Sequence, residues 1–164
     1  MGLNRRYSKA FSLIELLVVL SIISLLITLG SHNYVAQIKK SKLLQAQSDL
    51  LTFASRFEQY KLFNLTYFGA AGTQISPENT GKPWIYQSFS PANKPEQQRL
   101  FDLSILSVSD DGLQYQIIAT PSVQAGIASS STYGVLIYYS DGRRGYDKNN
   151  DGDLTDNEMC WDCL

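Results

Sequence analysis

The chain has little of the residues on which metal chemistry and acid–base catalysis commonly depend. Its 164 residues include one histidine, His32, and two cysteines, Cys160 and Cys163. A single histidine excludes a histidine metal cluster and a catalytic histidine pair, and two cysteines alone fall short of a zinc site. The formal net charge of -1 gives no general electrostatic attraction to nucleic acid. We therefore expect a protein that is not an enzyme.

The longest apolar run lies near the N-terminus and contains one ionisable residue. From Phe11 to Leu29 the residues are apolar or small, with Glu15 as the exception. As a helix, this run is long enough to cross a bilayer core of about 30 Å. An acidic residue at the centre of such a helix costs about 2.5 to 3.5 kcal/mol, so Glu15 needs a partner or a function.

This segment resembles the N-terminus of the type IV pilin-like proteins, whose precursors carry a short basic leader followed by Phe-Thr/Ser-Leu-Ile-Glu. Here the leader is residues 1–10, and residues 11–15 read Phe-Ser-Leu-Ile-Glu. The resemblance implies that a prepilin peptidase cuts after Ala10 and methylates Phe11. It also implies that Glu15 pairs with the N-terminal amine of a neighbouring subunit. Ala10 stands where the family usually has glycine.

An ordinary secretory signal peptide or signal anchor is the alternative for this segment, because it also has a basic start and an apolar core. A cleavable signal peptide usually has a shorter apolar core, followed by a small-residue cleavage site. An acidic residue five positions after a small residue is not expected there. We therefore favour the pilin interpretation.

The helical pattern continues beyond the apolar run. Apolar residues recur on roughly helical spacing as far as Phe63, and charged residues fill the positions between them. This part is amphipathic, with one stripe for a core and one face for water. We predict a continuous helix from about Leu13 to Phe63. Its first half, residues 11–33, is predicted to be transmembrane and to assemble subunits, and residues 34–164 comprise its amphipathic half and a globular head.

A long connector, residues 67–99, is rich in glycine, proline, asparagine and serine. It contains Trp84, Tyr86 and Phe89, which could pack as a plug or short strand or could form an exposed surface. We favour packing because buried rings are the common case.

Three strand candidates follow the connector: Phe101 to Val108, Leu113 to Thr120, and Tyr133 to Tyr139. The Ser-Asp-Asp-Gly sequence of residues 109–112 is typical of a hairpin turn between the first two. Together they predict an antiparallel meander of three to four strands, covered on one face by the amphipathic part of the helix. The predicted fold class is α+β, and the resemblance implies the type IV pilin fold.

Residues 147–158 match the twelve-residue calcium loop position by position. Oxygen-bearing side chains stand at the first, third and fifth positions, glycine at the sixth, an apolar residue at the eighth and glutamate at the twelfth. The predicted Ca²⁺ ligands are Asp147, Asn149, Asp151, the backbone carbonyl of Asp153, Thr155 directly or through water, and Glu158. A solvated turn of Asp, Asn and Gly is the alternative.

The flanks of this loop contain no helix pair that could open, so we expect a structural rather than a sensing role for calcium. Binding would neutralise acidic side chains whose repulsion would otherwise splay the C-terminus. An extracellular site of this kind has a Kd on the order of 10⁻⁴ to 10⁻³ M.

The two cysteines follow the loop directly. In an oxidising compartment Cys160 and Cys163 are predicted to form a small disulfide loop, with free or intermolecular thiols as the alternative. A redox motif would need the first cysteine at an exposed helix N-terminus in a thioredoxin-like fold, and the sequence predicts neither.

Within the pilin-like family, the chain is most similar to the minor pilins of type IV pili. The similarity lies in residues 115–121 and 133–136, in Asp141-Gly142 and in the terminal Cys160-Trp161. The subgroup often has a cysteine where this chain has Tyr133. Its usual long-range disulfide is therefore absent here.

The resemblance implies a structural subunit of a type IV pilus. Such a subunit is inserted in the bacterial inner membrane with its head in the periplasm, and a prepilin peptidase processes it. An inner-membrane assembly platform then joins it to other pilin subunits in a filament on the cell surface.

A pseudopilin of a type II secretion system and a filament-borne adhesin or DNA-uptake receptor remain alternatives. Arg143, Arg144 and Lys148 form a local basic cluster, but the adjacent acidic loop opposes phosphate binding. Nucleic acid is therefore not the expected partner.

Overall fold

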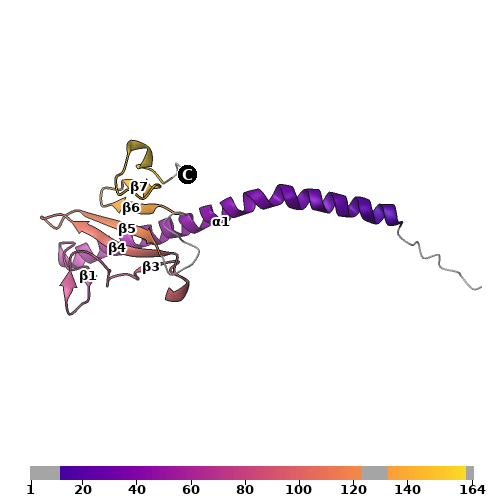
Figure 1. The fold of residues 1–164 in the computed structure, drawn as a ribbon. Helices are drawn as coiled ribbons and strands as arrows, with labels where there is room; N and C mark the ends of the chain where they lie inside the picture. The colour runs from indigo at the N-terminus through magenta and orange to yellow at the C-terminus, as the bar shows by residue number, and fades with distance from the viewer. Residues whose placement is uncertain (1–11, 123–132, 162–164) are drawn as a thin grey trace, which may run out of the picture. The chain divides into compact units, whose positions relative to one another are not determined.

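The computed structural model describes residues 12–122 and 133–161, apart from the side chains of residues 28–33. The chain divides into two compact units, Met1–Lys40 and Ser41–Leu164. One helix, α1, Leu13–Asn64, belongs to both units and confirms the predicted long helix (Figure 1). The predicted leader lies outside the described residues.

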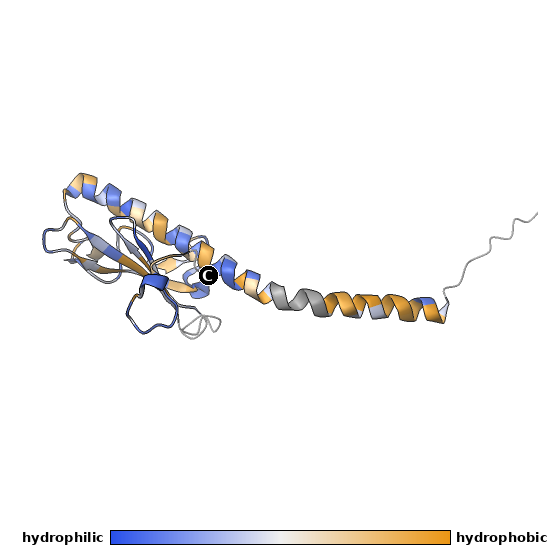
Figure 2. Ribbon diagram, turned by 90° about the horizontal axis from the view of Figure 1, so that it is seen from above, coloured by the Kyte–Doolittle hydropathy of each residue, from blue (hydrophilic) through white to orange (hydrophobic). Residues whose placement is uncertain are grey.

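In the first unit, α1 carries mostly apolar side chains (Figure 2). The large apolar side chains from Leu13 to Ile27 are exposed, because a single helix taken by itself buries none of them. Among the described residues, no helix combines the length and the apolar character needed to cross a membrane. The predicted transmembrane half is therefore not confirmed by the structure.

In the second unit, α1 is amphipathic and packs one face against a sheet. Its buried side chains recur every three or four residues, as one face of a helix requires: Leu43, Ala46, Leu50, Phe53, Ala54 and Phe57. The helix ends where Leu65 adopts a left-handed conformation, with φ of 61°. The Leu65 N–H donates to the Lys61 carbonyl over 2.7 Å, which satisfies one of the last helical carbonyls.

The sheet has five antiparallel strands in the order β3-β4-β5-β6-β7 (Figure 1). Their bounds are β3 Phe89–Ser90, β4 Phe101–Val108, β5 Tyr115–Pro121, β6 Val135–Tyr139 and β7 Arg144–Asp147. A separate two-stranded sheet pairs β1, Ala71–Gly72, with β2, Pro77–Glu78, and two short 3₁₀ helices are η1, Glu96–Gln98, and η3, Asp156–Glu158.

These elements confirm the α+β fold class, and β4 has the predicted bounds. The sheet is larger than the predicted three to four strands. β7, which begins at Arg144, was not among the predicted strands, and β3 lies within the predicted connector. Both strands are too short to show an alternating pattern in the sequence. They are strands because they pair with longer neighbours; in β7, for example, Tyr146 pairs with Leu136 of β6.

The core lies between α1 and the inward face of the sheet, and aromatic rings fill much of it. The ring of Phe57 lies 4.5 Å from that of Tyr115 and 5.0 Å from that of Tyr67, measured between centroids. Tyr86 of the connector stacks on Phe53 at 5.6 Å. Full burial of one such side chain stabilises the fold by about 1.5 to 3 kcal/mol. The packing predicted for the connector therefore holds for Tyr86.

A buried carboxylate ties the helix to the connector. Asp49 is 5% exposed, and its Oδ2 accepts hydrogen bonds from Ser90 Oγ at 2.5 Å and Ala92 N at 3.0 Å. Its Oδ1 accepts a third from Gln45 Nε2 at 3.2 Å. Burial of a carboxylate is costly unless hydrogen bonds replace those to water, and these three donors provide the replacement.

Candidate functional site

The N-terminal candidate site is described from Ser12 onward, so the predicted cleavage and methylation residues Ala10 and Phe11 lie outside the described residues. The N–H groups of Glu15 and Leu16 donate to the Ser12 carbonyl at 3.1 and 3.2 Å, which begins α1. Glu15 is exposed in the first turn of the helix. A carboxylate at this position interacts favourably with the positive end of the helix dipole.

The second candidate site is the acidic loop that follows β7. Asp147 ends this strand and is 3% exposed. Its Oδ1 accepts a hydrogen bond from Asn150 N at 2.6 Å, and its Oδ2 accepts one from Gly152 N at 3.0 Å. Asn150 and Gly152 both have positive φ, 58° and 87°. The first and sixth positions of the predicted calcium loop are thereby joined around a tight turn.

The far end of the loop folds back on its beginning through Glu158. The Glu158 Oε2 accepts hydrogen bonds from Thr155 N at 3.1 Å and Thr155 Oγ1 at 2.8 Å. Its Oε1 accepts one from Lys148 N at 3.3 Å. These hydrogen bonds hold the pKa of the Glu158 carboxyl below its usual range, and the Thr155 side chain has a larger effect than the Thr155 backbone N–H.

The middle of the loop is held by its own amides. Asn149 Nδ2 donates to Asp151 Oδ2 at 2.7 Å, and Asp153 N donates to Asp151 Oδ1 at 2.9 Å. In the described part of the chain, no three acidic, histidine or cysteine side chains are grouped as a metal centre. The structure thus brings the predicted ligands into one folded loop but does not converge them, because their oxygens accept hydrogen bonds from the loop itself.

Two glycines that carry no ligand atoms bring the loop against the sheet. A Cβ at Gly134 would collide with the carbonyl of Asp147, and a Cβ at Gly145 would lie 2.6 Å from Leu154 Cδ1. Leu154, the apolar eighth position, therefore packs on β7. Neither glycine was identified as part of the site from the sequence, because the approach is between segments that only the fold brings together.

The segment after the loop is anchored by Trp161, which is 4% exposed. Its ring centroid lies 6.0 Å from that of Tyr138, and the Arg144 guanidinium lies 5.1 Å from it on the ring face. The Sγ of Cys160 lies 3.4 Å from the Asn157 carbonyl oxygen. Cys163 lies outside the described residues, so the disulfide stays a prediction.

In the local basic cluster, the side chain of Arg143 already contacts neighbouring residues of the head. Arg143 Nε forms an ion pair with Asp141 Oδ2 at 2.7 Å, and its guanidinium lies 4.6 Å from the centroid of the Tyr139 ring. The Arg143 backbone N–H and guanidinium hold the pKa of Asp141 below its usual range. Because Asp141 neutralises one of the arginines, the cluster is weaker for phosphate than its sequence indicates.

The comparisons with known proteins locate the family signal at the N-terminus. The prokaryotic N-terminal methylation motif matches residues 5–31, a range that contains the predicted cleavage site and Glu15. No curated protein matches the chain. The motif indicates a membrane-anchored precursor that later joins other pilin subunits in a filament. This motif, at the start of a long helix that packs on an antiparallel sheet, supports the assignment of the chain as a type IV pilin-like prepilin.

Proposed function

We propose that the chain is a structural subunit, of the minor class, of a type IV pilus. The observation that carries this proposal is the methylation motif at residues 5–31, which overlaps the start of α1. In this proposal a prepilin peptidase cuts after Ala10 and methylates Phe11. The inner membrane holds the precursor, and the assembly platform then inserts it into the filament. The protein catalyses no reaction.

The exposed surface of α1 in the first unit supports a role in assembly. Its large apolar side chains include Leu13 at 84% exposure and Leu26 at 62%. A continuous apolar surface of this kind is unfavourable in water and indicates contact with lipid or with other protein. In the proposed cycle, lipid covers this surface before assembly and neighbouring helices cover it afterwards. Glu15 would then pair with the methylated amine of a neighbouring subunit, which offsets the cost of burying its charge.

Intact-mass spectrometry of sheared filaments and of the membrane fraction tests the proposal directly. We expect a species that begins at methylated Phe11 in the sheared fraction, at a lower amount than another pilin. A processed chain found only in the membrane would contradict a pilus role and favour a type II secretion pseudopilin. A larger amount than any other pilin would contradict the minor class.

The Glu15→Ala variant tests the proposed pairing. Removal of the carboxylate should leave processing intact and lower incorporation into sheared filaments several-fold. The matched control is Glu78→Ala, which removes an exposed carboxylate from β2 of the head and should incorporate normally. Normal incorporation of Glu15→Ala would show that the pairing is dispensable.

The acidic loop is proposed to bind Ca²⁺ in a structural role. Asp147, Asn149, Asp151, the Asp153 carbonyl, Thr155 and Glu158 would hold the ion. The closure of the loop between its first and sixth positions supports this proposal, and so does the packing of Leu154 on Gly145. The ion would neutralise the carboxylates and draw together oxygens that otherwise accept hydrogen bonds from loop amides.

A thermal melt of the full chain in detergent, with calcium or with a chelator, tests whether the loop binds Ca²⁺. For a Kd on the order of 10⁻⁴ to 10⁻³ M, 10 mM Ca²⁺ should stabilise the head by about 1.4 to 2.7 kcal/mol. Asp151→Ala should abolish this gain, whereas Asp156→Ala, which removes an exposed carboxylate at a non-ligand position of the same loop, should keep it. An unchanged melting temperature of the wild-type chain would refute the calcium site.

A further inference from the structure

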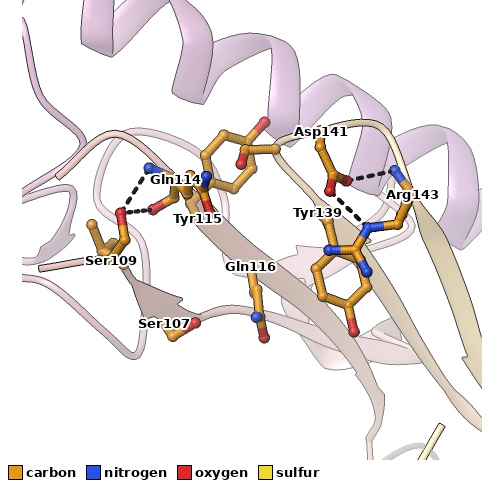
Figure 3. Close-up of a pocket in the computed structure, with 10 residues that line it drawn as sticks. Ser107, Ser109, Gln114, Tyr115, Gln116, Tyr139, Asp141 and Arg143 are labelled. Atoms are coloured by element: carbon orange, nitrogen blue, oxygen red, sulfur yellow. Dashed lines mark hydrogen bonds and ion pairs between the residues drawn. The ribbon is translucent and has the colours of Figure 1, made fainter. Parts of the chain in front are cut away.

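A polar cavity of about 160 Å³ lies on the head beside the ends of two hairpins (Figure 3). One hairpin joins β4 to β5, and the other joins β6 to β7. Ser107, Gln116 and Tyr139 line the cavity and form a row across the three strands, because Ser107 pairs with Gln116 and Gln116 with Tyr139. The cavity is small compared with the several hundred Å³ of a typical drug-sized site.

A β-bulge places Ser107 in this row. Ile105 faces the core at 2% exposure, and in a regular strand Ser107, two residues later, would face the core as well. The pairing shifts between Ile105 and Ser107, so that Leu106 is an extra residue and Ser107 lies opposite Gln116 on the outer face. Bulges are enriched next to functional sites, where they redirect a side chain.

The polar groups of the row are available to a ligand. In the part of the chain that the structure describes, the side chains of Ser107, Gln116 and Tyr139 make no hydrogen bond to the protein, and Figure 3 shows the three side chains at the cavity. Each can both donate and accept. Adjacent strands are about 4.8 Å apart, so three side chains in a row span about 10 Å.

The remaining wall carries no net charge, because its one carboxylate and its one guanidinium form an ion pair. Asp141 accepts hydrogen bonds from Arg143 N at 3.0 Å and from Arg143 Nε at 2.7 Å, and the guanidinium lies over the ring of Tyr139. An anionic ligand would meet the Asp141 carboxylate beside the arginine. A metal ion would find a single carboxylate that is already paired, and an apolar ligand would leave the surrounding hydroxyl and amide groups without partners.

We propose that this cavity binds one uncharged saccharide residue, such as the end of a neutral glycan. A sugar ring presents several hydroxyl groups that donate and accept at once, which matches the row of Ser107, Gln116 and Tyr139. A peptide fits less well, because peptide recognition generally uses a free strand edge, an apolar groove or an arginine cluster. At the cavity β5 is paired on both sides, with β4 and β6. This binding would add adhesion to the proposed role in assembly and does not depend on it.

Saturation-transfer NMR on the full chain tests the site, in a detergent without a sugar headgroup. The probes are glucose, galactose, mannose, N-acetylglucosamine and N-acetylgalactosamine with their disaccharides, and sialylated and sulfated sugars and a pool of short peptides serve as comparison. We expect at least one uncharged sugar to bind. Gln116→Ala should weaken its binding at least about tenfold, because the amide is a central contact of the row.

Ser104→Ala is the matched control, because Ser104 lies on β4, the strand of Ser107, but outside the cavity, and it pairs with Ile118, two residues beyond Gln116 on β5. It should bind like the wild type. Tyr139→Phe removes a single hydroxyl and provides a second variant if Gln116→Ala lowers the melting temperature. Three results would overturn the proposal: no binding of any uncharged sugar, equal binding by Gln116→Ala and Tyr139→Phe, or binding of anionic sugars or peptides alone.

Discussion

Trp161 donates its indole N–H to the carbonyl oxygen of Gly145 over 2.9 Å and so attaches the C-terminal segment to β7. Gly145 lies in β7 and pairs with Ile137 of β6. The buried Trp161 ring also contacts Tyr138 of β6 and Arg144 of β7. The C-terminal segment is therefore attached to both strands.

This attachment predicts two separable losses of stability. Trp161→Phe keeps an aromatic ring but removes the hydrogen bond, and it should lower the free energy of unfolding by about 1 kcal/mol. Trp161→Ala also removes the buried ring and should cost about 3 to 5 kcal/mol. Urea unfolding of the full chain in detergent measures both losses.

The control for this comparison is Trp84→Ala. Trp84 also donates its indole N–H to a backbone carbonyl, that of Gly69 at 2.7 Å, but it is 37% exposed. Its replacement should therefore cost less than Trp161→Ala. Equal costs for the two alanine variants would contradict the anchoring role of Trp161.

Long periodic elements could be predicted from the sequence, because their patterns extend over many residues. The helix from Leu13 and the strand from Phe101 to Val108 were predicted close to their observed bounds. The bulge at Leu106 could not be predicted, because it changes which face Ser107 occupies without changing the composition of the strand. The burial of Asp49 could not be predicted either, since the three donors to its carboxylate come from its own helix and from a connector about 40 residues away.

The candidate sites were predicted where the signal is local. The methylation motif is a short contiguous pattern, and the family match confirms it at residues 5–31. The order of residues 147–158 predicted a folded loop, but hydrogen bonds from loop amides determine where the carboxylate oxygens of Asp151 and Glu158 point. Residue spacing does not show whether these oxygens accept hydrogen bonds from loop amides or point toward a common centre. The glycine contacts that hold the loop on the sheet also depend on tertiary packing.

The contacts of Gly134 and Gly145 predict that a glycine-to-alanine substitution destabilises the chain by different amounts at the two positions. Gly134→Ala would force a Cβ against the backbone of Asp147, and the backbone there cannot move without disturbing the β6–β7 pairing. We expect a loss of about 2 to 3 kcal/mol in the free energy of unfolding. Gly145→Ala meets only the flexible end of the Leu154 side chain and should cost about 1 kcal/mol or less.

Urea unfolding of the two alanine variants, compared with the wild type, measures the difference between Gly134 and Gly145. A Gly134→Ala variant as stable as Gly145→Ala would show that the loop does not need the close approach of β6. A reversed order would show that Leu154 is held more rigidly than the backbone of Asp147.

The buried tyrosines predict a loss of stability at high pH. Tyr67 donates its hydroxyl to both carboxylate oxygens of Glu58 at 2.8 Å, and burial together with this carboxylate raises the pKa of Tyr67 well above its usual value. Burial and the charge of Glu58 raise the pKa of Tyr115 in the same direction. The folded chain therefore holds these two protons more tightly than the unfolded chain does.

A group whose pKa is higher in the folded chain than in the unfolded chain contributes its full stabilisation at pH values below the unfolded pKa. The contribution of Tyr67 and Tyr115 to the free energy of unfolding is therefore complete below about pH 10. Above that pH the unfolded chain releases the protons first, and each tyrosine should lower the free energy of unfolding by about 1.4 kcal/mol per pH unit. Tyr67→Phe should remove one such contribution from the slope above pH 10, while at neutral pH it should cost about 1 to 3 kcal/mol through the lost hydrogen bond to Glu58. Urea unfolding at intervals from pH 7 to 11.5 measures both effects. A slope that is the same for the variant and the wild type would mean that Tyr67 ionises as easily in the folded chain as in the unfolded one.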